Sequence, residues 1–201
     1  MGWTTEADLL DGQRTDIEEV SSIINDPNAR LLLATTDQGI AGCILIRREL
    51  EGAYVGVVAV SPDLQELGIG KRLLGEAERR SAIEFGARRW RKTVIEQRTE
   101  LVVWYVRHGY IVSGRTEPFP YGNSRFGIPR RDDLRFMVLE KSVVPPHQKS
   151  CCGNDGSQFG PRRGVPLDPR PSPDGRWESE LVFPFPNERR GWGMRVTSHL
   201  V

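Results

Sequence analysis

A strand, a glycine-containing turn and a helix follow one another without a linker between Ala53 and Phe85, and this unit constrains the fold most. Its first part, 53–60, is apolar and rich in β-branched residues, and Ser61-Pro62 ends it, as expected of a buried strand. Its last part repeats apolar residues at helical spacing from about Gly70 onward. A strand that leads directly into a helix requires a sheet with a helix packed on one of its faces.

The turn inside this unit, Gln65-Glu66-Leu67-Gly68-Ile69-Gly70, has the properties of an anion-binding site. The first turn of a helix presents N–H groups without intrahelical partners and the positive end of the helix dipole. Gly68 and Gly70 allow the backbone to approach a phosphate closely and to adopt positive φ. Lys71 and Arg72 add positive charge just inside the helix. The turn therefore predicts binding of a phosphate or diphosphate group.

The rest of residues 1–144 is patterned as well. Thr15-Asp16-Ile17-Glu18 has the form of a capping box and predicts a short helix that Asn25-Asp26-Pro27 ends. Gly56, inside the strand 53–60, predicts a bulge or a close backbone approach. Further strands are expected at 31–35, 40–47, 93–96, 110–113 and 134–140, and a further helix at 100–107, with Gly109 after its end.

The order α, β, β, β, α, β, α, β, β predicts an α/β (α+β) domain over residues 1–144. Its sheet is expected to be twisted, mixed and mostly antiparallel, with one parallel βαβ unit and flanking helices. Composition changes after residue 144: 16 of the 57 residues in 145–201 are Pro or Gly. Because unpatterned sequence of this composition is usually disordered, residues 145–201 are expected to form an unstructured tail.

Bulk composition excludes several classes of function. The chain has 28 basic and 27 acidic side chains, a balance that provides no field for nucleic acid or an anionic membrane. No apolar run approaches the roughly 20 residues that span a bilayer, and the N-terminus lacks the features of a signal peptide. Cys43, Cys151 and Cys152 form neither a disulfide framework nor a Cys/His metal-ligand spacing. The composition predicts a cytoplasmic protein without a metal.

Two familiar phosphate-binding motifs do not match the turn. The dinucleotide fingerprint GxGxxG requires a third glycine, and Leu73 occupies that position. The P-loop requires Gly-Lys followed by Ser or Thr, and here Gly70-Lys71 is followed by Arg72. The turn is therefore neither a dinucleotide-binding turn nor a P-loop, and another class of diphosphate-binding protein has to be considered.

The pattern that does match is Gln/Arg-x-x-Gly-x-Gly/Ala after a strand. With this motif the chain resembles the GNAT superfamily of acyl-CoA-dependent N-acyltransferases. The resemblance extends through the strand Val94-Ile95-Glu96 and the run from Glu100 to Tyr110, which is similar to the family's helix with an aromatic-Tyr pair, a short basic stretch and a Gly-aromatic pair. It covers about residues 30–141, and several motifs occur in the family's order.

The resemblance implies a binding mode for acetyl-CoA, the acyl donor. The donor would lie between two splayed parallel strands, 54–60 and 93–97. Backbone groups of Val58 and Val60 would pair with its pantetheine arm, and an N–H near Val58 would face the thioester carbonyl. The backbone N–H groups of the turn would hold the pyrophosphate; these are the N–H groups of Gln65, Glu66, Leu67, Gly68, Ile69, Gly70 and Lys71.

The resemblance also implies two catalytic residues. Tyr105 occupies the family's position for protonating the departing thiolate, although a phenol with a reference pKa of about 10 transfers its proton uphill to a thiolate with a reference pKa near 8.5. The alternative is that Tyr105 is a packing aromatic beside Trp104. Glu96 would remove the proton from the acceptor amine, directly or through water. As an alternative, Glu96 is an ordinary charge at a strand end.

The expected activity is transfer of an acetyl group to a primary amine of a small molecule by direct attack on the thioester. Two alternatives stay open: acetylation of protein amines, and a non-catalytic acyl-CoA-binding domain. The second arises because Trp3 to Leu10 resembles material that follows the family's first helix, so the first strand and most of that helix are expected to be missing. One edge of the sheet would then be unpaired: either a homodimer or the chain's own tail would pair it, or the protein would be impaired.

Overall fold

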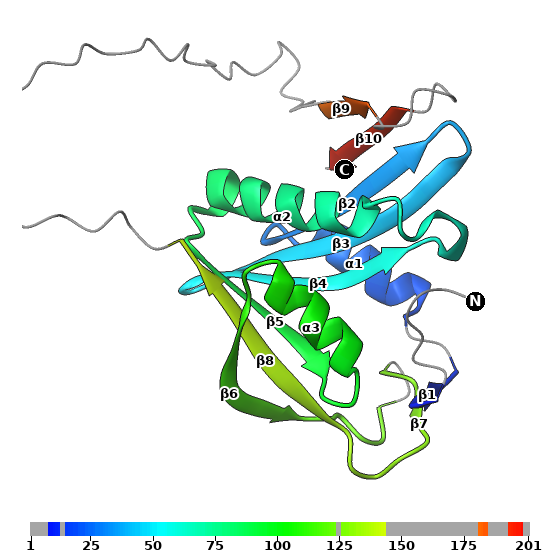
Figure 1. Cartoon of the computed structure of the whole chain (residues 1–201), viewed down its shortest axis with the longest axis vertical. Helices are drawn as coiled ribbons and strands as arrows, with labels where there is room; N and C mark the ends of the chain where they lie inside the picture. Colours follow the sequence, from blue (N-terminus) through cyan, green and yellow to red (C-terminus); the bar gives the residue numbers. More distant parts are fainter. Residues whose placement is uncertain (1–7, 13–14, 124–125, 144–180, 185–192, 199–201) are drawn as a thin grey trace, which may run out of the picture.

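The computed structural model describes residues 8–12, 15–123, 126–143, 181–184 and 193–198 (Figure 1). Its elements, in chain order, are β1 (Leu10–Asp11), α1 (Ile17–Asn25), β2 (Ala29–Thr36), β3 (Gly39–Glu49), β4 (Gly52–Val60), the 3-10 turn η1 (Pro62–Leu64), α2 (Ile69–Phe85), β5 (Arg89–Ile95), α3 (Thr99–Arg107), β6 (Ile111–Pro118), β7 (Ile128–Pro129), β8 (Arg135–Ser142), β9 (Leu181–Pro184) and β10 (Gly193–Ser198).

One eight-stranded sheet in the order β6-β8-β5-β4-β3-β2-β10-β9 organises the fold, and β1 and β7 form a small separate pair. Every neighbouring pair is antiparallel except β4 and β5, which are parallel at Ala53↔Trp90 and Tyr54↔Arg91. Helix α2 connects these two strands, so β4-α2-β5 is the parallel βαβ unit that the sequence predicts. The mixed, mostly antiparallel α/β fold is confirmed.

The sheet buries both of its faces against helices. Ile44 and Ile46 of β3 pack into the main core with Leu73 of α2 and Tyr105 of α3, whereas Leu45 packs on the opposite face with Ile23 of α1. Neighbouring residues of a strand point to opposite faces, which is why an apolar run such as Ile44-Leu45-Ile46 can serve both cores. Helices α2 and α3 therefore cover one face and α1 the other.

Helix α1 begins one residue later than the capping box predicts. Asp16 is the N-cap, and its Oδ1 accepts a hydrogen bond from the Glu19 N–H at 2.7 Å. Thr15 instead donates its hydroxyl to the Glu19 carboxylate at 2.9 Å. Apart from this shift of one residue, the structure confirms the predicted helix and its end at Asp26. Helix capping depends on residues that are close together in the sequence, so the sequence alone can predict it.

The last two strands correct the expectation of an unstructured tail. Strand β10 pairs antiparallel with β2, with Val196 opposite Ala34, and β9 pairs with the outer side of β10. Val196 is 1% exposed and belongs to the main core. The edge of β2 is thus paired by the chain's own tail, which is one of the two solutions expected for an unpaired edge. The remainder of 145–201 lies outside the described residues, and homodimerisation stays a prediction.

The physical reason for this difference is the origin of strand stability. A segment becomes a strand when a partner edge satisfies its backbone groups and a core accepts its side chains. Both the edge and the core come from residues 29–36 and their neighbours, far from β10 in sequence. A composition rich in Pro and Gly describes only the segment itself. It carries no information about the free edge of β2 with which β10 pairs.

Candidate active site

The parallel strands β4 and β5 separate after only two paired positions (Figure 1). Pairing ends at Tyr54↔Arg91, and the remainder of both strands, which the structure describes completely, has no register between them. On their outer sides β4 stays paired with β3 and β5 with β8. The divergence of two parallel strands in the middle of a sheet leaves backbone groups facing each other without a direct ladder. An extended ligand could complete that ladder.

A bulge in β4 lies at the start of this divergence. Leu45 pairs with Gly56 and Cys43 with Ala59, so Val57 and Val58 together face a single residue of β3. Val57 has φ 45°, a left-handed conformation that β-branched residues rarely adopt. The extra residue shifts the alternation so that Val58 and Val60 pack towards the helices α2 and α3. The bulge predicted from Gly56 is confirmed, one residue further along.

The turn after β4 has an open helix N-terminus. Gly68 is the N-cap of α2 with φ 77°, no side chain caps this end, and the first turn contains no acidic residue. Glu66 also has a positive φ, 69°, which is uncommon for a residue other than glycine. Such outliers concentrate at functional sites, where surrounding structure holds them. The first helical N–H groups, from Ile69 to Lys71, have no intrahelical acceptor and point out of the helix.

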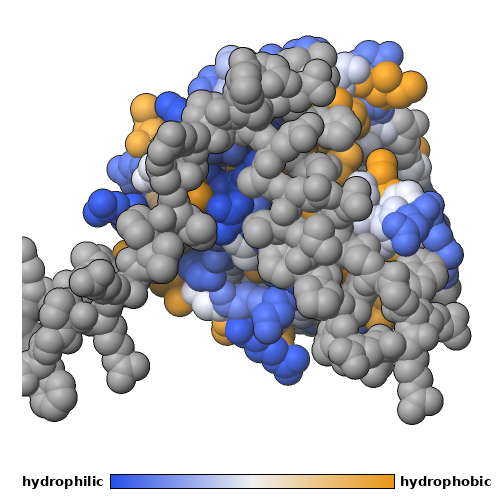
Figure 2. All heavy atoms as spheres, turned by 90° about the horizontal axis from the view of Figure 1, so that it is seen from above, coloured by the Kyte–Doolittle hydropathy of each residue, from blue (hydrophilic) through white to orange (hydrophobic). Residues whose placement is uncertain are grey.

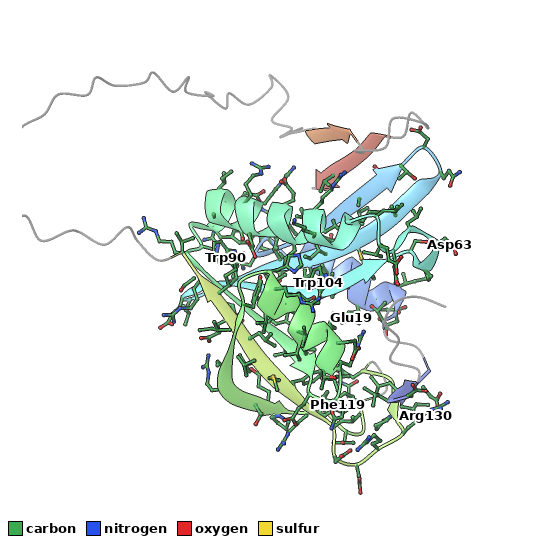
Figure 3. All side chains as sticks on the ribbon, in the orientation of Figure 1. Glu19, Asp63, Trp90, Trp104, Phe119 and Arg130 are labelled. Atoms are coloured by element: carbon green, nitrogen blue, oxygen red, sulfur yellow. The ribbon has the colours of Figure 1, made fainter. Side chains whose placement is uncertain are left out.

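The turn, the end of β4 and helix α3 meet at Gly70. A Cβ atom built on Gly70 would lie 3.6 Å from Trp104 of α3 and 3.7 Å from Val60 of β4, which is ordinary contact. Trp104 lies between the two helices (Figure 3). The Gln65 side chain ties the turn back to the strand by donating to the Val60 carbonyl at 3.4 Å. The structure therefore brings the predicted donor-binding segments together with the helix that carries Tyr105.

Tyr105 is buried in the main core with 1% of its surface exposed. Its ring meets Trp104 and Tyr110 edge-on, with centroid distances of 4.8 and 5.7 Å. Burial raises the pKa of the Tyr105 phenol above its usual range, and the charge of Arg98 opposes this shift only in part. The Tyr105 ring is consequently part of the core packing, and its hydroxyl stays uncharged. Its role in catalysis stays a prediction.

Lys92 is a residue of this region that the sequence patterns did not single out. It lies on β5 between Trp90 and Val94, is 3% exposed, and places its Nζ 3.6 Å from the centroid of the Tyr105 ring. Loss of solvation, together with the charge of Arg98, lowers the pKa of Lys92 to about 7. The alternation Trp90, Lys92, Val94 was a detectable signal, but the predicted strand began at residue 93 and left Lys92 outside it.

Stability should therefore rise with pH because of Lys92. Its pKa falls from an ordinary value of 10.5 to about 7 in the folded chain, so the unfolded chain binds more protons between these values. We expect the free energy of unfolding to increase by about 2 kcal/mol between pH 7 and pH 9, measured by urea denaturation. Lys92→Met should be more stable at pH 7 and should lose most of this increase. An equal rise in both proteins would contradict the burial of a charged lysine.

Glu96 directly follows the last residue of β5. Its carboxylate forms an ion pair with the Arg135 guanidinium of β8, including a hydrogen bond from Nη2 to Oε1 at 3.2 Å. The Glu96 N–H also donates to the Arg135 carbonyl at 3.0 Å. Glu96 is thus engaged by a partly exposed cation, and acting as a base would require release from Arg135. The assignment of Glu96 as base stays a prediction.

The face of the splayed strands that carries α1 has its own polar groups, which the sequence patterns also left unnoticed. The Tyr54 hydroxyl lies 3.0 Å from Thr93 Oγ1 and so joins β4 to β5 where their backbones separate. The Tyr54 ring lies over Gly56, where an added Cβ would approach Cε1 to 2.5 Å. The Arg91 guanidinium stands 5.1 Å from the same ring.

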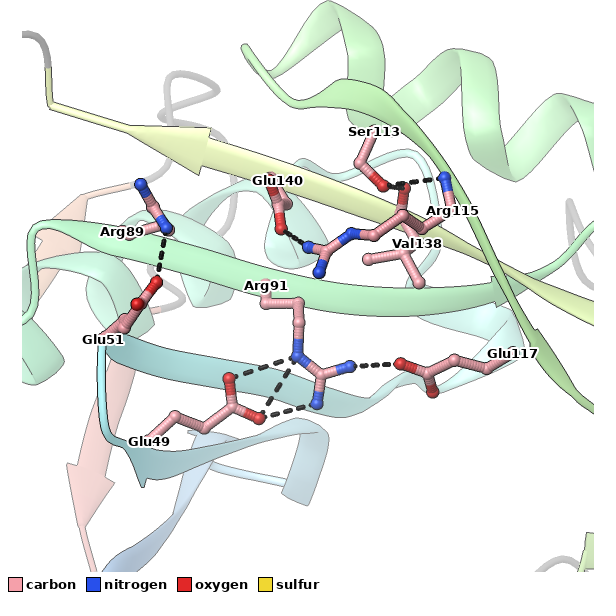
Figure 4. A network of polar contacts seen from close by, with 9 residues as sticks. All are labelled: Glu49, Glu51, Arg89, Arg91, Ser113, Arg115, Glu117, Val138 and Glu140. Atoms are coloured by element: carbon pink, nitrogen blue, oxygen red, sulfur yellow. Dashed lines mark hydrogen bonds and ion pairs between the residues drawn. The ribbon is translucent and has the colours of Figure 1, made fainter.

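Arg91 is in turn held by two carboxylates (Figure 4). Its Nη2 lies 2.6 Å from Glu49, and its Nη1 lies 2.7 Å from Glu117 of β6. These ion pairs raise the pKa of Arg91, so the guanidinium stays charged. The network gives this face an ordered polar surface next to the exposed bulge at Val57.

The described part of the chain has neither a candidate membrane-spanning helix nor a candidate metal-binding cluster. No helix there has both the length and the apolar character needed to cross a membrane. No three His, Cys, Asp or Glu side chains of the described ranges gather closely enough to bind a metal ion. On the face shown in Figure 2, the hydrophobic side chains that are coloured lie among hydrophilic ones. Cys43 is half-buried with its Sγ 3.7 Å from the Val57 carbonyl, and burial raises the pKa of its thiol.

Comparison with solved structures identifies the fold. A GNAT family acetyltransferase from Elizabethkingia anophelis with bound acetyl-CoA is 18% identical, with a TM-score of 0.52 over 71% of this chain and 93% of that one. A protein from Bacillus anthracis strain Ames assigned as a streptothricin acetyltransferase, in complex with acetyl coenzyme A, is 20% identical, with a TM-score of 0.51 over 62% and 68%. The IAA acetyltransferase of Bacillus cereus ATCC 14579 is 17% identical, with a TM-score of 0.51 over 64% and 85%.

At these identities the structural similarity establishes the fold alone. No curated protein sequence matches the chain. The family profile described as "Acetyltransferase (GNAT) domain" matches residues 9–119, which is more than half of the chain and includes the splayed strands, the turn and α3. The resemblance inferred from the turn motif is confirmed, and the chain belongs to the GNAT family of acyl-CoA-dependent acetyltransferases.

Proposed function

We propose that this protein transfers an acetyl group from acetyl-CoA to a primary amine of a small molecule in the cytoplasm. The observation that carries the proposal is the divergence of β4 and β5 directly beside an uncapped helix N-terminus. A CoA thioester has an extended arm with amide groups and a pyrophosphate at a fixed distance along it. The splayed strands suit the arm, and the turn suits the pyrophosphate.

The turn fits a diphosphate by its charge as well as by its shape. Two positive-φ residues, Glu66 and Gly68, bend the backbone before α2, and the dipole of a 17-residue helix ends there. Lys71 is exposed on the first turn. The N–H groups from Glu66 to Lys71 would hold the pyrophosphate, whereas the predicted Gln65 N–H donates to the Pro62 carbonyl at 3.4 Å. Val58 and Val60 would hold the pantetheine arm by backbone hydrogen bonds, as an additional strand would.

The chain's own groups would then act on the thioester as follows. The Val58 N–H would stabilise the negative charge that develops on the carbonyl oxygen when the amine attacks. The Tyr105 hydroxyl would donate a hydrogen bond to the departing sulfur, which a neutral phenol can do while keeping its proton. Glu96, after release from Arg135, would accept the amine proton through water.

The acceptor site would lie on the α1 face of the splayed strands. Tyr54, Thr93 and Arg91 form an ordered polar surface there, next to the bulge in β4. This surface is suited to a small molecule with hydrogen-bonding groups. The relatives assigned to streptothricin and to IAA acetylation carry small-molecule acceptors in their names, which supports a small-molecule acceptor for this chain.

Two measurements test the proposal. Isothermal titration with CoA should show binding, and a thiol-release assay over a panel of primary amines should show acetyl-CoA-dependent turnover. Binding without turnover for any small-molecule amine or amine-bearing peptide would favour a non-catalytic acyl-CoA-binding protein. Turnover with peptides alone would favour a protein acetyltransferase. Absence of CoA binding would overturn the proposal itself.

Replacing Tyr105 with phenylalanine should lower kcat by about 10- to 100-fold and leave CoA affinity within a factor of two. The variant removes one hydroxyl from a buried ring, so the packing with Trp104 and Tyr110 is kept. Tyr110→Phe is the matched control, because Tyr110 is an equally buried ring for which no role at the thioester is proposed. Equal kcat values for Tyr105→Phe and the wild-type protein would exclude the hydroxyl from the reaction.

A further inference from the structure

Lys92 is an unusual residue for the main core. Lysine is almost never fully buried unless a carboxylate pairs with it. Among the described residues no carboxylate lies within ion-pair distance of the Lys92 ammonium, and its closest defined partner is the Tyr105 ring, 3.6 Å from Nζ. A cation over an aromatic face gains part of the stabilisation that a carboxylate would provide. An isolated buried charge in this position needs a reason beyond packing.

The charged groups around Lys92 do not neutralise it. Arg98, at the N-terminus of α3, is itself buried and repels the ammonium, while Glu100 pairs with Arg98 at 3.5 Å. On α2, Glu78 binds Lys141 at 2.6 Å. Glu76, also on α2, is held by two arginines of its own helix, Arg79 and Arg80. On β8, Glu140 pairs with Arg115. The carboxylates of the neighbouring elements are therefore committed to other cations.

The position of Lys92 relates it to the proposed thioester site. Lys92 is the first residue of β5 beyond the last paired position of β4 and β5, Tyr54↔Arg91. Its side chain leaves the strand on the face that carries Tyr105, and its ammonium rests on that ring. A sulfur atom bound at the Tyr105 hydroxyl would therefore lie near Lys92 as well, and rotation of the last bonds of the lysine side chain would bring Nζ towards it.

Resting on the proposed acetyltransferase function, we propose that the Lys92 ammonium is the acid that protonates the CoA sulfur as it leaves. Tyr105 orients the sulfur by a hydrogen bond, and Lys92 supplies the proton. The family resemblance implies that Tyr105 alone protonates the departing thiolate, whereas here the two residues share this role.

The acidities of the two residues agree with this division. Burial raises the pKa of Tyr105 above its ordinary value, so transfer of the phenol proton to a thiolate becomes less favourable still. The pKa of Lys92 is lowered to about 7, below the reference value of a thiol near 8.5, so transfer from the ammonium to the thiolate is downhill. The ammonium also attracts the negative charge that grows on sulfur before the proton moves.

The step balances as follows. The amine nitrogen forms a bond to the thioester carbonyl carbon, the carbon–sulfur bond breaks, and its electron pair remains on sulfur. One proton moves from Lys92 Nζ to sulfur, which gives the free thiol and a neutral lysine. The new amide nitrogen loses its extra proton through water to Glu96, and neutral Lys92 takes a proton from water. Tyr105 keeps its proton throughout.

The Lys92→Met variant tests this role, because methionine has a similar length, no charge and an apolar character that suits the core. The first readout needs only CoA: the ultraviolet absorbance of the thiolate is followed while protein-bound CoA is titrated with base. In the wild-type protein the bound thiol should begin to ionise near pH 7, while Lys92 is still partly an ammonium, and the thiolate fraction there should be at least about threefold higher than in Lys92→Met. Desulfo-CoA provides the blank.

The second readout is the pH dependence of kcat with an amine identified by the panel. Wild-type kcat should fall as pH rises through the pKa of Lys92, because the ammonium is then lost. Lys92→Met should show a kcat at least about 100-fold lower, no such alkaline decline, and an unchanged KM for acetyl-CoA. Lys141→Met is the control, since Lys141 also lies near a tyrosine ring, 5.7 Å from the Tyr110 centroid, but is paired with Glu78.

The outcomes separate the two proposals. If the wild-type protein acetylates amines and Lys92→Met keeps the same thiolate fraction of bound CoA and the same pH profile, the role of Lys92 is overturned and the acetyltransferase function stands. If no amine is acetylated but bound CoA shows the Lys92-dependent thiolate fraction, the proposed enzymatic activity fails and the placement of Lys92 beside the sulfur is supported. If CoA does not bind, both proposals fall. Thermal unfolding of each variant shows whether it is folded.

Discussion

CoA affinity should fall by at least about 100-fold when Gly68 is replaced by glutamate. Gly68 is the N-cap of α2 at φ 77°, and nothing lies within 4 Å of the position of an added Cβ. The side chain therefore enters open space without a clash, and its carboxylate lies at the positive end of the helix. There it would compete with the pyrophosphate for the same N–H groups and repel its charge. Isothermal titration with CoA measures the loss.

Two control variants separate charge from backbone strain. Gly68→Asn tolerates the left-handed conformation better than most residues and adds no charge, so its CoA affinity should fall by less than about tenfold. Gly75→Glu adds the same charge at an exposed position of α2, again with nothing within 4 Å of the added Cβ, and should leave binding unchanged. Wild-type CoA affinity in Gly68→Glu would show that the pyrophosphate binds elsewhere.

Removing the C-terminal strands should destabilise the whole domain. Truncation after residue 180 exposes the backbone edge of β2 and leaves the core without Val196, which is 1% exposed. Burying a valine side chain alone contributes about 1.5–3 kcal/mol, and an open edge of this length also promotes association between molecules. We expect a loss of at least about 3 kcal/mol in the free energy of unfolding, measured by urea denaturation, with dimers or larger species in light scattering.

A point variant tests the same strand without changing the length of the chain. Val196→Asp buries an unpaired carboxylate in the main core and should cost about 3–5 kcal/mol. Ile40→Asp places the same charge on β3 at a residue that is 65% exposed and should cost less than about 0.5 kcal/mol. If truncation and Val196→Asp both leave the unfolding midpoint unchanged, β10 does not complete the sheet.

The predicted and observed elements agree best where local interactions decide them. The helix expected from about Gly70 to Phe85 runs from Ile69 to Phe85, because apolar spacing along one face defines its length. The αL conformation expected at Gly109, after the end of α3, is observed with φ 88°. The bulge foreseen from Gly56 occurs at Val57. Each of these features depends on residues within a few positions of one another.

In the candidate site, too, residues that belong to local motifs could be predicted, whereas contacts between distant residues could not. The predicted phosphate-binding turn, Val58, Val60 and Tyr105 were chosen from the family resemblance, and the structure brings these segments together around Gly70 and Trp104. Glu96 was also chosen from its position on a strand end, yet its carboxylate is held by Arg135 of β8. Tyr54 and Thr93 meet through a hydrogen bond between strands that are joined by a whole helix. No local pattern could indicate that contact.

By itself, the sequence determined the strand–turn–helix unit and the family to which the chain belongs, and it predicted an anion-binding turn. These depend on backbone conformation and on the spacing of neighbouring residues, which the linear order contains. Only the tertiary structure decided that β10 completes the sheet and that Lys92 is buried over Tyr105. Pairing partners and desolvation are set by residues distant in sequence, because a side chain loses water only when other elements fold against it.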